Sequence, residues 1–218
     1  MSDEIHPILR TLFPRDTTAV FLEIGCHYGH DSMQLRTSFP NARIICFEPD
    51  PRNIYTFKRS GVHNHVELVE AAVSDTDGTT TMYLSGGRPA QVPKNAEPVG
   101  WTASSSIKKP DRVTKIYPWM NFAQTAKVKT TRLDTFCAEN NIDQIGFIWA
   151  DVQGAEAEVL AGGQAALAKT KYLFTEFGFQ RLYEGELGPD DILARLPGKW
   201  DVMGRWTYDM LLKNVAFT

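Results

Sequence analysis

The chain has 218 residues, of which 43% are hydrophobic and 22% are charged, and its formal net charge is −3. This composition is ordinary for a folded enzyme and excludes the polar, highly charged class of disordered proteins. The slightly acidic balance provides no electrostatic surface for general nucleic-acid or membrane binding. No apolar run approaches the roughly 20 residues that a membrane-spanning helix needs.

The length suits one domain, since domains usually contain about 100–200 residues. The three cysteines Cys26, Cys46 and Cys137 are odd in number and widely spaced, which favours reduced core thiols over disulfides or a zinc site. The first residues, MSDEIHPILRTLF, are acidic where a signal peptide needs a basic region. We therefore expect a cytoplasmic protein.

Short apolar runs rich in β-branched residues alternate with amphipathic segments, which is typical of a parallel sheet flanked by helices. We expect strands at 19–24, 43–47, 66–72, 79–84, 127–132, 145–150, 172–177, 200–206 and 210–217. Helices are expected at about 31–39, 52–58, 133–140, 155–167 and 190–196. The pattern predicts an α/β fold, a doubly wound, Rossmann-like, mostly parallel sheet that ends in an antiparallel hairpin.

Between about residues 85 and 126 the pattern becomes irregular, because glycines and prolines interrupt every periodic run. We expect an insertion here within a single domain that spans residues 1–218. Long loops in compact domains often act as lids or binding loops. Disorder is the other interpretation of this segment, and the sequence leaves both open.

The clearest local motif is Phe21-Leu22-Glu23-Ile24-Gly25-Cys26-His27-Tyr28-Gly29, a buried strand that ends in a glycine turn before a helix. Backbone N–H groups at such a helix start are free to bind a carboxylate or a phosphate. Glu48 ends the next strand, where an acid can accept hydrogen bonds from ribose hydroxyls. Turn and acid together predict a nucleoside cofactor; a helix cap plus a surface acid is the alternative.

The type of nucleoside follows from the side chains in the turn. A dinucleotide site uses G-x-G-x-x-G, whose glycines admit a pyrophosphate. Here His27 and His30 occupy the second and third glycine positions, and no phosphate loop ending in Gly-Lys-Ser/Thr occurs in the chain. S-adenosyl-L-methionine carries adenosine without phosphate, so we expect it as the cofactor.

Further blocks follow the turn in order: Phe47-Glu48-Pro49, Ala71-Ala72-Val73-Ser74-Asp75, Asp151-Val152-Gln153-Gly154-Ala155-Glu156, Thr175-Glu176-Phe177 and Leu182-Tyr183-Glu184-Gly185. With these blocks the chain resembles the FkbM family of class I methyltransferases from about residue 20 to 217. The resemblance implies a seven-stranded sheet with an antiparallel last strand. It also implies methyl transfer to an oxygen of a sugar, a polyketide or another small hydroxylated metabolite.

The resemblance also implies roles for single residues. The turn, with Glu23, Gly25, His27 and Gly29, would shape the methionine end of the cofactor site, and Glu48 would hold the ribose. Val73, Ser74 and Asp75 would frame the adenine, and Ser105 in a run of three serines would line the cofactor. The chain departs from the family at Trp149, where lysine is frequent, and at Gln153, where glutamate is frequent.

Transfer to an alcohol needs a group that takes the hydroxyl proton. Asp151 is the first candidate, because it follows an apolar strand at the edge where ligands bind in open α/β sheets. Capping the next helix or holding the cofactor are its alternative roles. Glu176 is the second candidate, and His27 and His30 are histidines that titrate near neutrality. Tyr28, Trp101 and Phe177 are candidates for holding the sulfonium by cation–π contact.

Two other functions use the same motifs. One is an NAD(P)-dependent oxidoreductase or epimerase, and the other is a non-catalytic nucleoside-binding module. A basic stretch, Lys108, Lys109, Arg112 and Lys115, is either a solvated loop face or a site for an anionic substrate. We expect a small hydroxylated substrate as the partner, no nucleic acid, no membrane and no metal, because two carboxylates alone are a weak metal signal.

Overall fold

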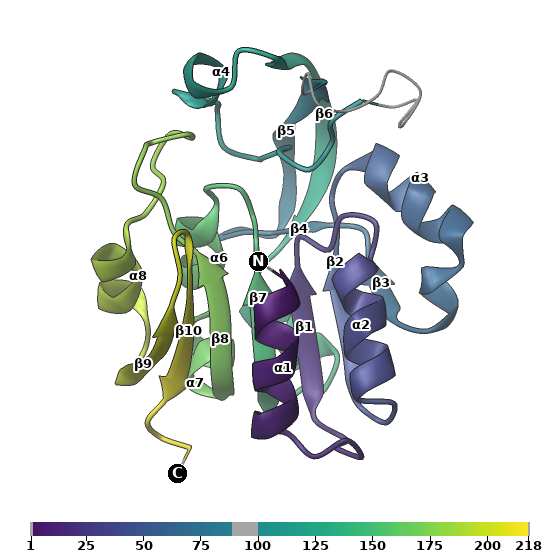
Figure 1. Ribbon diagram of the computed structural model, residues 1–218, viewed down its shortest axis with the longest axis vertical. Coiled ribbons are helices and arrows are strands. Elements are labelled where there is room, and N and C mark those ends of the chain that lie inside the picture. The colour runs from purple at the N-terminus through teal and green to yellow at the C-terminus, as the bar shows by residue number, and fades with distance from the viewer. Residues whose placement is uncertain (1, 89–99, 218) are drawn as a thin grey trace.

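The computed structural model describes residues 2–88 and 100–217. Its main sheet has seven strands in the order β3-β2-β1-β7-β8-β10-β9 (Figure 1). In this order they are β3 (Glu67–Val69), β2 (Arg43–Phe47), β1 (Val20–Ile24), β7 (Ile145–Ala150), β8 (Thr170–Glu176), β10 (Asp209–Asn214) and β9 (Trp200–Arg205). All pairs are parallel except those of β10, which runs antiparallel to β8 and β9. The expected α/β fold with an antiparallel C-terminal hairpin is confirmed.

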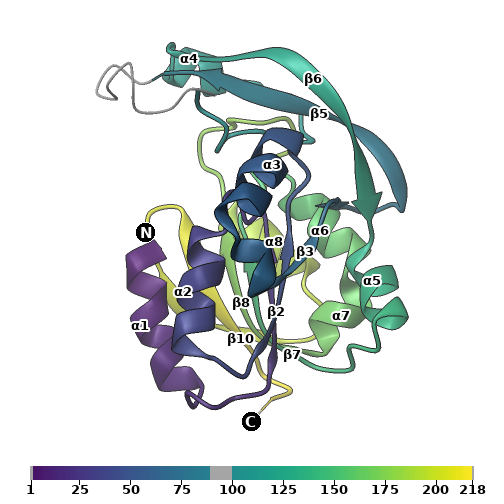
Figure 2. The same cartoon turned by 90° about the vertical axis from the view of Figure 1, so that its right-hand side faces the viewer.

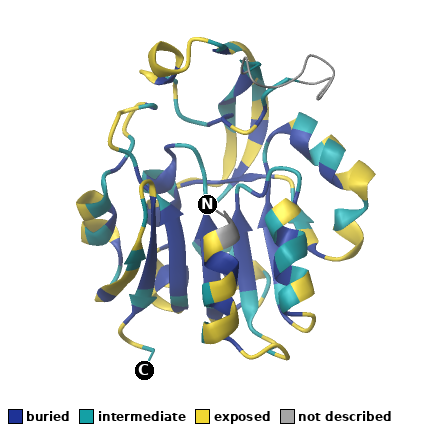
Figure 3. Cartoon of the chain, viewed as in Figure 1, coloured by how far each residue is buried: buried dark blue, intermediate teal, exposed yellow. Residues whose placement is uncertain are grey.

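Helices cover both faces of the sheet (Figure 2). One face packs against α1 (Ser2–Leu12), α2 (His30–Ser38) and α3 (Pro51–Ser60), and the other against α5 (Leu133–Glu139), α6 (Glu156–Gly162), α7 (Gln164–Ala168) and α8 (Pro189–Arg195). The central strands are buried along almost their whole length, while the helices expose their outer sides (Figure 3). Strands buried on both faces explain the continuous apolar runs of the sequence.

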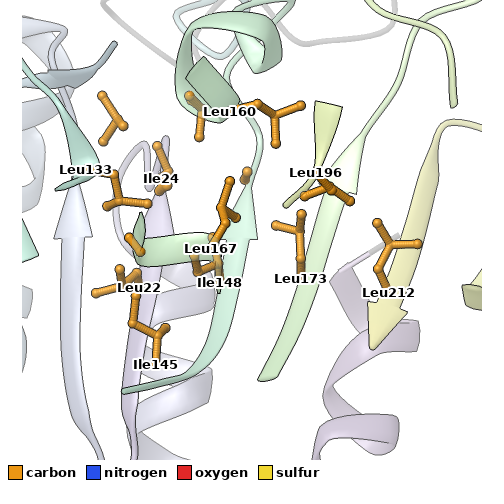
Figure 4. Close-up of a cluster of buried hydrophobic side chains, with 14 of the residues drawn as sticks. Leu22, Ile24, Leu133, Ile145, Ile148, Leu160, Leu167, Leu173, Leu196 and Leu212 are labelled. Carbon is orange, nitrogen blue, oxygen red and sulfur yellow. The ribbon is translucent and has the colours of Figure 1, made fainter. Parts of the chain in front are cut away.

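The core on the α5–α8 side consists of aliphatic side chains from neighbouring strands and helices (Figure 4). Leu22 and Ile148 come from adjacent strands and contact the same layer as Leu167 from α7. All three are completely buried. This packed layer holds β1 and β7 side by side, so that the turns after both strands open at the same edge.

The expected elements do not include α1. Ile5, Leu9 and Phe13 follow one another at four-residue spacing, and all three are buried against the sheet. This spacing is the signal that indicates a helix, although Pro7 lies within it. The helix forms because its apolar side packs on the central strands β1, β7 and β8, on the same face of the sheet as α2.

A second, three-stranded sheet has the order β4-β6-β5. Its strands are β4 (Ala72–Val73), β5 (Gly78–Gly87) and β6 (Met120–Thr131), and the short helices η1 (Val62–Asn64) and α4 (Val113–Ile116) complete the described elements. β5 and β6 form a long antiparallel arm beyond the carboxyl ends of the main sheet (Figures 1 and 2). Both strands extend into the segment that was expected to be irregular.

Two expected boundaries are wrong for physical reasons. The expected strand 66–72 is divided between β3 and β4, because the chain leaves the main sheet at this point and pairs with β6. The expected helix 155–167 is interrupted at Gly163, which separates α6 from α7. Among residues 2–88 and 100–217, no helix has the length and apolar character that crossing a membrane requires.

Gly162 ends α6 and is buried against the backbone of Ser74. A Cβ at this position would overlap the carbonyl oxygen of Ser74. We expect Gly162→Ala to lower the free energy of unfolding by about 1–3 kcal/mol, because overpacking outweighs the gain in helix propensity. Urea unfolding measures the change, and the exposed neighbouring substitution Ala161→Ser is the control. A more stable Gly162→Ala variant would contradict this packing.

Candidate active site

A cavity of about 320 Å³ lies at the carboxyl ends of the central strands. Residues that follow β1, β2, β7 and β8 line it, and the 102–107 segment next to the β5–β6 arm closes it. β1 lies between β2 and β7, and the strand order reverses at β1, because β2 and β3 follow on one side of it and β7 and β8 on the other. In open α/β sheets a crevice opens between the turns at such a point. The volume is within the range of small-molecule sites.

The turn after β1 requires glycine at two places. Gly25 has a φ of 93°, and a Cβ there would overlap the carbonyl oxygen of Asp151. Gly29 has a φ of 78°, and a Cβ there would overlap the ring of Phe57. Gly25 lines the cavity, whereas Gly29 does not and instead starts α2. No side chain caps the start of α2, so its first N–H groups are available near the cavity.

Glu48 lies at the end of β2 and lines the cavity, although it is only 4% exposed. Its Oε2 accepts a hydrogen bond from the amide of His27 at 2.8 Å, and its Oε1 accepts one from the amide of Asp50 at 2.7 Å. Asn53 Nδ2 donates to the same Oε1 at 3.3 Å. Burial raises the pKa of Glu48 to about 8, against the lowering effect of these donors. A carboxylate offers about four acceptor positions, so further donors can still bind it.

Only some of the residues that were expected to surround the adenine line the cavity. Val73 and Ser105 line the cavity, but Ser74 and Asp75 do not. The hydroxyl of Ser74 donates to the carboxylate of Asp75 at 3.2 Å, and Asp75 is exposed to solvent. The cavity wall on this side ends with β4, since Ala72 and Val73 line it and the next two residues, Ser74 and Asp75, do not.

Ser105 contributes to the cavity wall mainly by fixing its neighbours. Its hydroxyl donates to Asp50 Oδ2 at 2.8 Å and accepts from the guanidinium of Arg52 at 3.0 Å. Arg52 in turn pairs with Asp50 at 2.7 Å. The charges of Arg52 and Asp50 are therefore paired with each other, and Arg52 is not one of the residues that line the cavity.

Thr102 is a cavity residue that sequence reasoning missed. It is 2% exposed, and its hydroxyl lies 2.8 Å from Nε2 of His27 and 3.0 Å from the hydroxyl of Tyr28. The rings of His27 and Tyr28 are stacked with centroids 3.7 Å apart. No local pattern marks Thr102, because the contact joins segments about 75 residues apart in the chain.

His27 lines the cavity, but its expected titration near neutrality is wrong. Burial lowers the pKa of His27 to about 4, and the nearby Arg52 adds to this effect while Asp50 opposes it. The ring is therefore neutral at pH 7. His30 also lines the cavity and pairs with Gln34 on the outside of α2.

The ionisable side chains that line this cavity are mostly acids. Six carboxyl groups line it, those of Glu23, Asp31, Glu48, Asp151, Glu176 and Asp209. None of the described lining residues is lysine or arginine. Glu23 accepts a hydrogen bond from the hydroxyl of Ser32, and burial raises its pKa well above the usual value. Asp31 lies 3.3 Å from the ring of His6 in α1. The arrangement favours a ligand with positive charge and no phosphate.

Asp151 and Glu176 form a half-buried pair at the ends of the adjacent strands β7 and β8. Gln153 Nε2 donates to Oδ1 of Asp151 at 2.6 Å and to Oε2 of Glu176 at 3.1 Å. Burial raises the pKa of Asp151 and raises that of Glu176 well above its usual range, with a further contribution from Asp151. Two carboxyl groups this close share one proton. The pKa of Glu176 is raised further than that of Asp151, so Asp151 is the first of the two groups to ionise as the pH rises.

Gln153 adopts the left-handed backbone region, with a φ of 53°. Its carbonyl accepts a hydrogen bond from the hydroxyl of Ser106 at 2.7 Å, which ties the turn to the 102–107 segment. In this conformation the side-chain amide nitrogen of Gln153 donates to both carboxyl groups. Strained residues of this kind are concentrated at functional sites. No side chain caps α6, so Asp151 does not have the capping role that was its alternative.

A second cavity of about 420 Å³ adjoins the first, because Ala103, Gln153 and Glu176 line both. Of the aromatic side chains expected near the cofactor, Tyr28 lines the first cavity and Trp101 and Phe177 line the second. The basic stretch lines neither cavity. Lys108 pairs with Glu158 and Lys109 with Glu184. Within the described residues, no cluster of three or more acidic, His or Cys side chains is arranged to hold a metal ion.

Comparison with known proteins agrees with this arrangement. The model of the methyltransferase FkbM domain matches residues 23–208. The 2-O-methyltransferase NoeI of Sinorhizobium fredii is 38% identical over 200 residues, which cover 89% of this chain and 79% of NoeI. This chain belongs to the FkbM methyltransferase family. The expected family and the expected enzyme class, a methyltransferase, are confirmed.

Solved structures share the fold at low sequence identity. A crystal structure of WbdD matches 98% of this chain with a TM-score of 0.54 and 9% identity. The N-terminal domain of EvdMO1, with SAH bound, matches 97% of this chain with a TM-score of 0.50 and 12% identity. The chain spans 40% of the WbdD chain and 79% of the EvdMO1 chain.

Glu156 at the start of α6 is a buried acid that makes stability depend on pH. Burial raises its pKa to about 8, whereas an unfolded glutamate has a pKa of about 4.3. The folded state therefore keeps a proton that the unfolded state releases between these values, and stability falls as the pH rises from about 4.3 to 8. We expect Glu156→Gln to reduce this loss by up to about 1.4 kcal/mol per pH unit. Urea unfolding at several pH values measures it, and equal slopes in both proteins would contradict the raised pKa.

Proposed function

We propose that this protein transfers a methyl group from S-adenosyl-L-methionine to a hydroxyl oxygen of a small molecule. The observation that carries the proposal is the acidic cavity at the ends of β1 and β2. It combines a buried acid, Glu48, with five further carboxyl groups and with no lysine or arginine among its described lining residues. A nucleoside that is cationic and has no phosphate suits this set of groups, since buried unpaired charge is costly.

The residues divide the cavity into regions that suit the parts of this donor. Glu48 would accept hydrogen bonds from the ribose hydroxyls, and Val73, Met82 and Ile107 provide an apolar surface for the adenine. The uncapped N–H groups of α2 would hold the methionine carboxylate. Glu23 and Asp31 line the same region and would favour the ammonium group. When bound, the donor supplies an electrophilic methyl group.

The acceptor atom is an oxygen in this proposal. NoeI, which is a 2-O-methyltransferase by name, supports it through 38% identity over most of both chains. Asp151 would accept the hydroxyl proton, because it ionises more readily than Glu176, whose pKa is raised further. Gln153 would keep both carboxyl groups in place by donating to each. Trp149 occupies the position where relatives often have lysine and packs against Phe174, so a cationic side chain is not part of this mechanism.

The other functions considered fit the cavity less well. A nicotinamide dinucleotide carries two phosphates, which would meet acids and the side chain of His27 where they need donors or cations. A module without chemistry would not need the pair of Asp151 and Glu176, two neighbouring carboxyl groups that oppose each other's ionisation. We include in the proposal that residues 1–218 act as one methyltransferase domain. The three free, buried cysteines fit the reducing cytoplasm.

The proposal is tested by transfer of a labelled methyl group from S-adenosyl-L-methionine to a panel of hydroxylated compounds. We expect Asp151→Asn to lower turnover by about 10²–10⁴-fold, because the amide cannot accept the hydroxyl proton. The donor should still bind, which calorimetry measures separately. Asp143→Asn is the matched control, since it makes the same change before β7 at an exposed position.

Near-normal turnover of Asp151→Asn would remove Asp151 from the mechanism without affecting the donor assignment. A protein that binds the donor but methylates no hydroxyl compound would favour the non-catalytic alternative.

A further inference from the structure

The second cavity has walls of a distinct chemical kind. Seven aromatic side chains line it: Trp101, Tyr117, Trp119, Phe177, Phe179, Tyr183 and Tyr208. Several of these rings pack against one another. The rings of Trp101 and Trp119 lie edge to face with their centroids 5.4 Å apart. Tyr183 is fixed by a hydrogen bond of 2.7 Å from its hydroxyl to the carbonyl of Ser104. Rigid aromatic walls of this kind bind ring compounds that have an apolar face.

The polar groups in this cavity are acids and amides. Glu156, Glu176 and Glu186 line it, together with Gln153 and Gln180. Glu156 is 3% exposed, and its Oε2 has no hydrogen-bond partner among the residues that the structure describes. Its other oxygen accepts from the amide of Gly154 at 3.3 Å. A buried carboxyl oxygen without a partner, in the wall of a cavity, is a position where a ligand hydroxyl can bind.

Glu186 is held in the wall by the backbone. Its Oε2 accepts from the amide of Leu182 at 2.9 Å, and its carboxyl group packs on Gly178, where a Cβ would overlap it. Burial raises the pKa values of both Glu156 and Glu186. A protonated carboxyl group donates one hydrogen bond and accepts others, which matches the two-way hydrogen bonding of a hydroxyl.

Positive charge is missing from the lining. None of the described residues that line the second cavity is lysine, arginine or histidine. Arg205 lies over the rings of Phe177 and Phe179, at 5.1 and 5.8 Å from their centroids, but is not itself a lining residue. A phosphate in the cavity would face three carboxyl groups without a cation beside it. Burying such an unpaired charge is strongly unfavourable.

The two cavities meet beside the proposed base, since Gln153 and Glu176 line both cavities, while Asp151 lines the first and accepts a hydrogen bond from Gln153. We infer that the second cavity is the acceptor site, and that it takes neutral hydroxylated ring compounds while rejecting the same rings when they carry phosphate. This inference rests on the proposed function. The acceptor would therefore carry no phosphate when it is methylated. Any phosphate or nucleotide would be added to the ring after methylation or removed from it beforehand.

The test compares matched acceptors with labelled S-adenosyl-L-methionine. Each methyl glycoside of a panel is measured beside its monophosphate ester and beside the corresponding nucleoside-diphosphate sugar. We expect kcat/KM for the neutral ring to exceed that for its phosphorylated form by at least about 100-fold, which corresponds to about 2.7 kcal/mol. Equal or better use of the phosphorylated rings would overturn the inference and leave the proposed function standing.

A charge substitution at the cavity mouth provides an independent check. Gln180 lines the cavity and is exposed, so Gln180→Lys adds a cation without disturbing the core. We expect it to raise the ratio of phosphorylated to neutral turnover by about tenfold, which is the effect of about 1.4 kcal/mol. Gln144→Lys makes the same change before β7, at the opposite end of the sheet, and should leave the ratio unchanged.

An unchanged ratio in Gln180→Lys would count against the charge argument. Donor binding without transfer to any neutral ring would overturn the acceptor assignment, whereas absence of donor binding would overturn the proposed function itself.

Discussion

The carboxyl group of Glu48 joins the two turns on which the site depends. It accepts hydrogen bonds from the amide of His27 after β1 and from the amide of Asp50 after β2. Both turns are therefore fixed relative to one buried acid at the ends of adjacent parallel strands. Because the strands themselves are held by the packed layers on both faces, the opening between the turns has a defined shape before any ligand enters.

Several acids lie together at the carboxyl ends of the central strands, where they line the first cavity. Burial is the largest cause that raises the pKa values of Glu23, Glu48, Asp151 and Glu176. Asp209 shows the same effect, with a pKa raised to about 6 and an Oδ2 that has no hydrogen-bond partner within residues 2–88 and 100–217. Such groups lower the stability of the folded chain near neutral pH. A cationic ligand offsets this effect, so the same charges that weaken the fold favour a sulfonium donor.

The sequence predicted what local patterns determine. Gly25 and Glu48 follow apolar strands, and this order was enough to expect both at one cavity; Asp151 followed from the same reasoning. Thr102, Met82 and Ile107 were missed, because they reach the cavity through the arm and its neighbouring segment, and no periodicity reports such long-range contacts. Ser74 and Asp75 were expected to frame the adenine from the resemblance alone, and the cavity wall ends just before them, at Val73 in β4. Helix α1 was also missed, although Ile5, Leu9 and Phe13 have helical spacing.

Calorimetric titration of the purified protein with S-adenosyl-L-methionine, and separately with NAD+ and NADP+, tests the central claim most directly. We predict saturable binding of the methyl donor and no detectable binding of either dinucleotide at pH 7. Glu48→Ala should weaken donor binding by about tenfold, since two hydrogen bonds to the ribose hydroxyls would be lost and each contributes about 0.5–1.5 kcal/mol. The exposed substitution Glu67→Ala should leave it unchanged. Tighter binding of a dinucleotide than of the methyl donor would contradict the claim that this acidic cavity selects a nucleoside without phosphate.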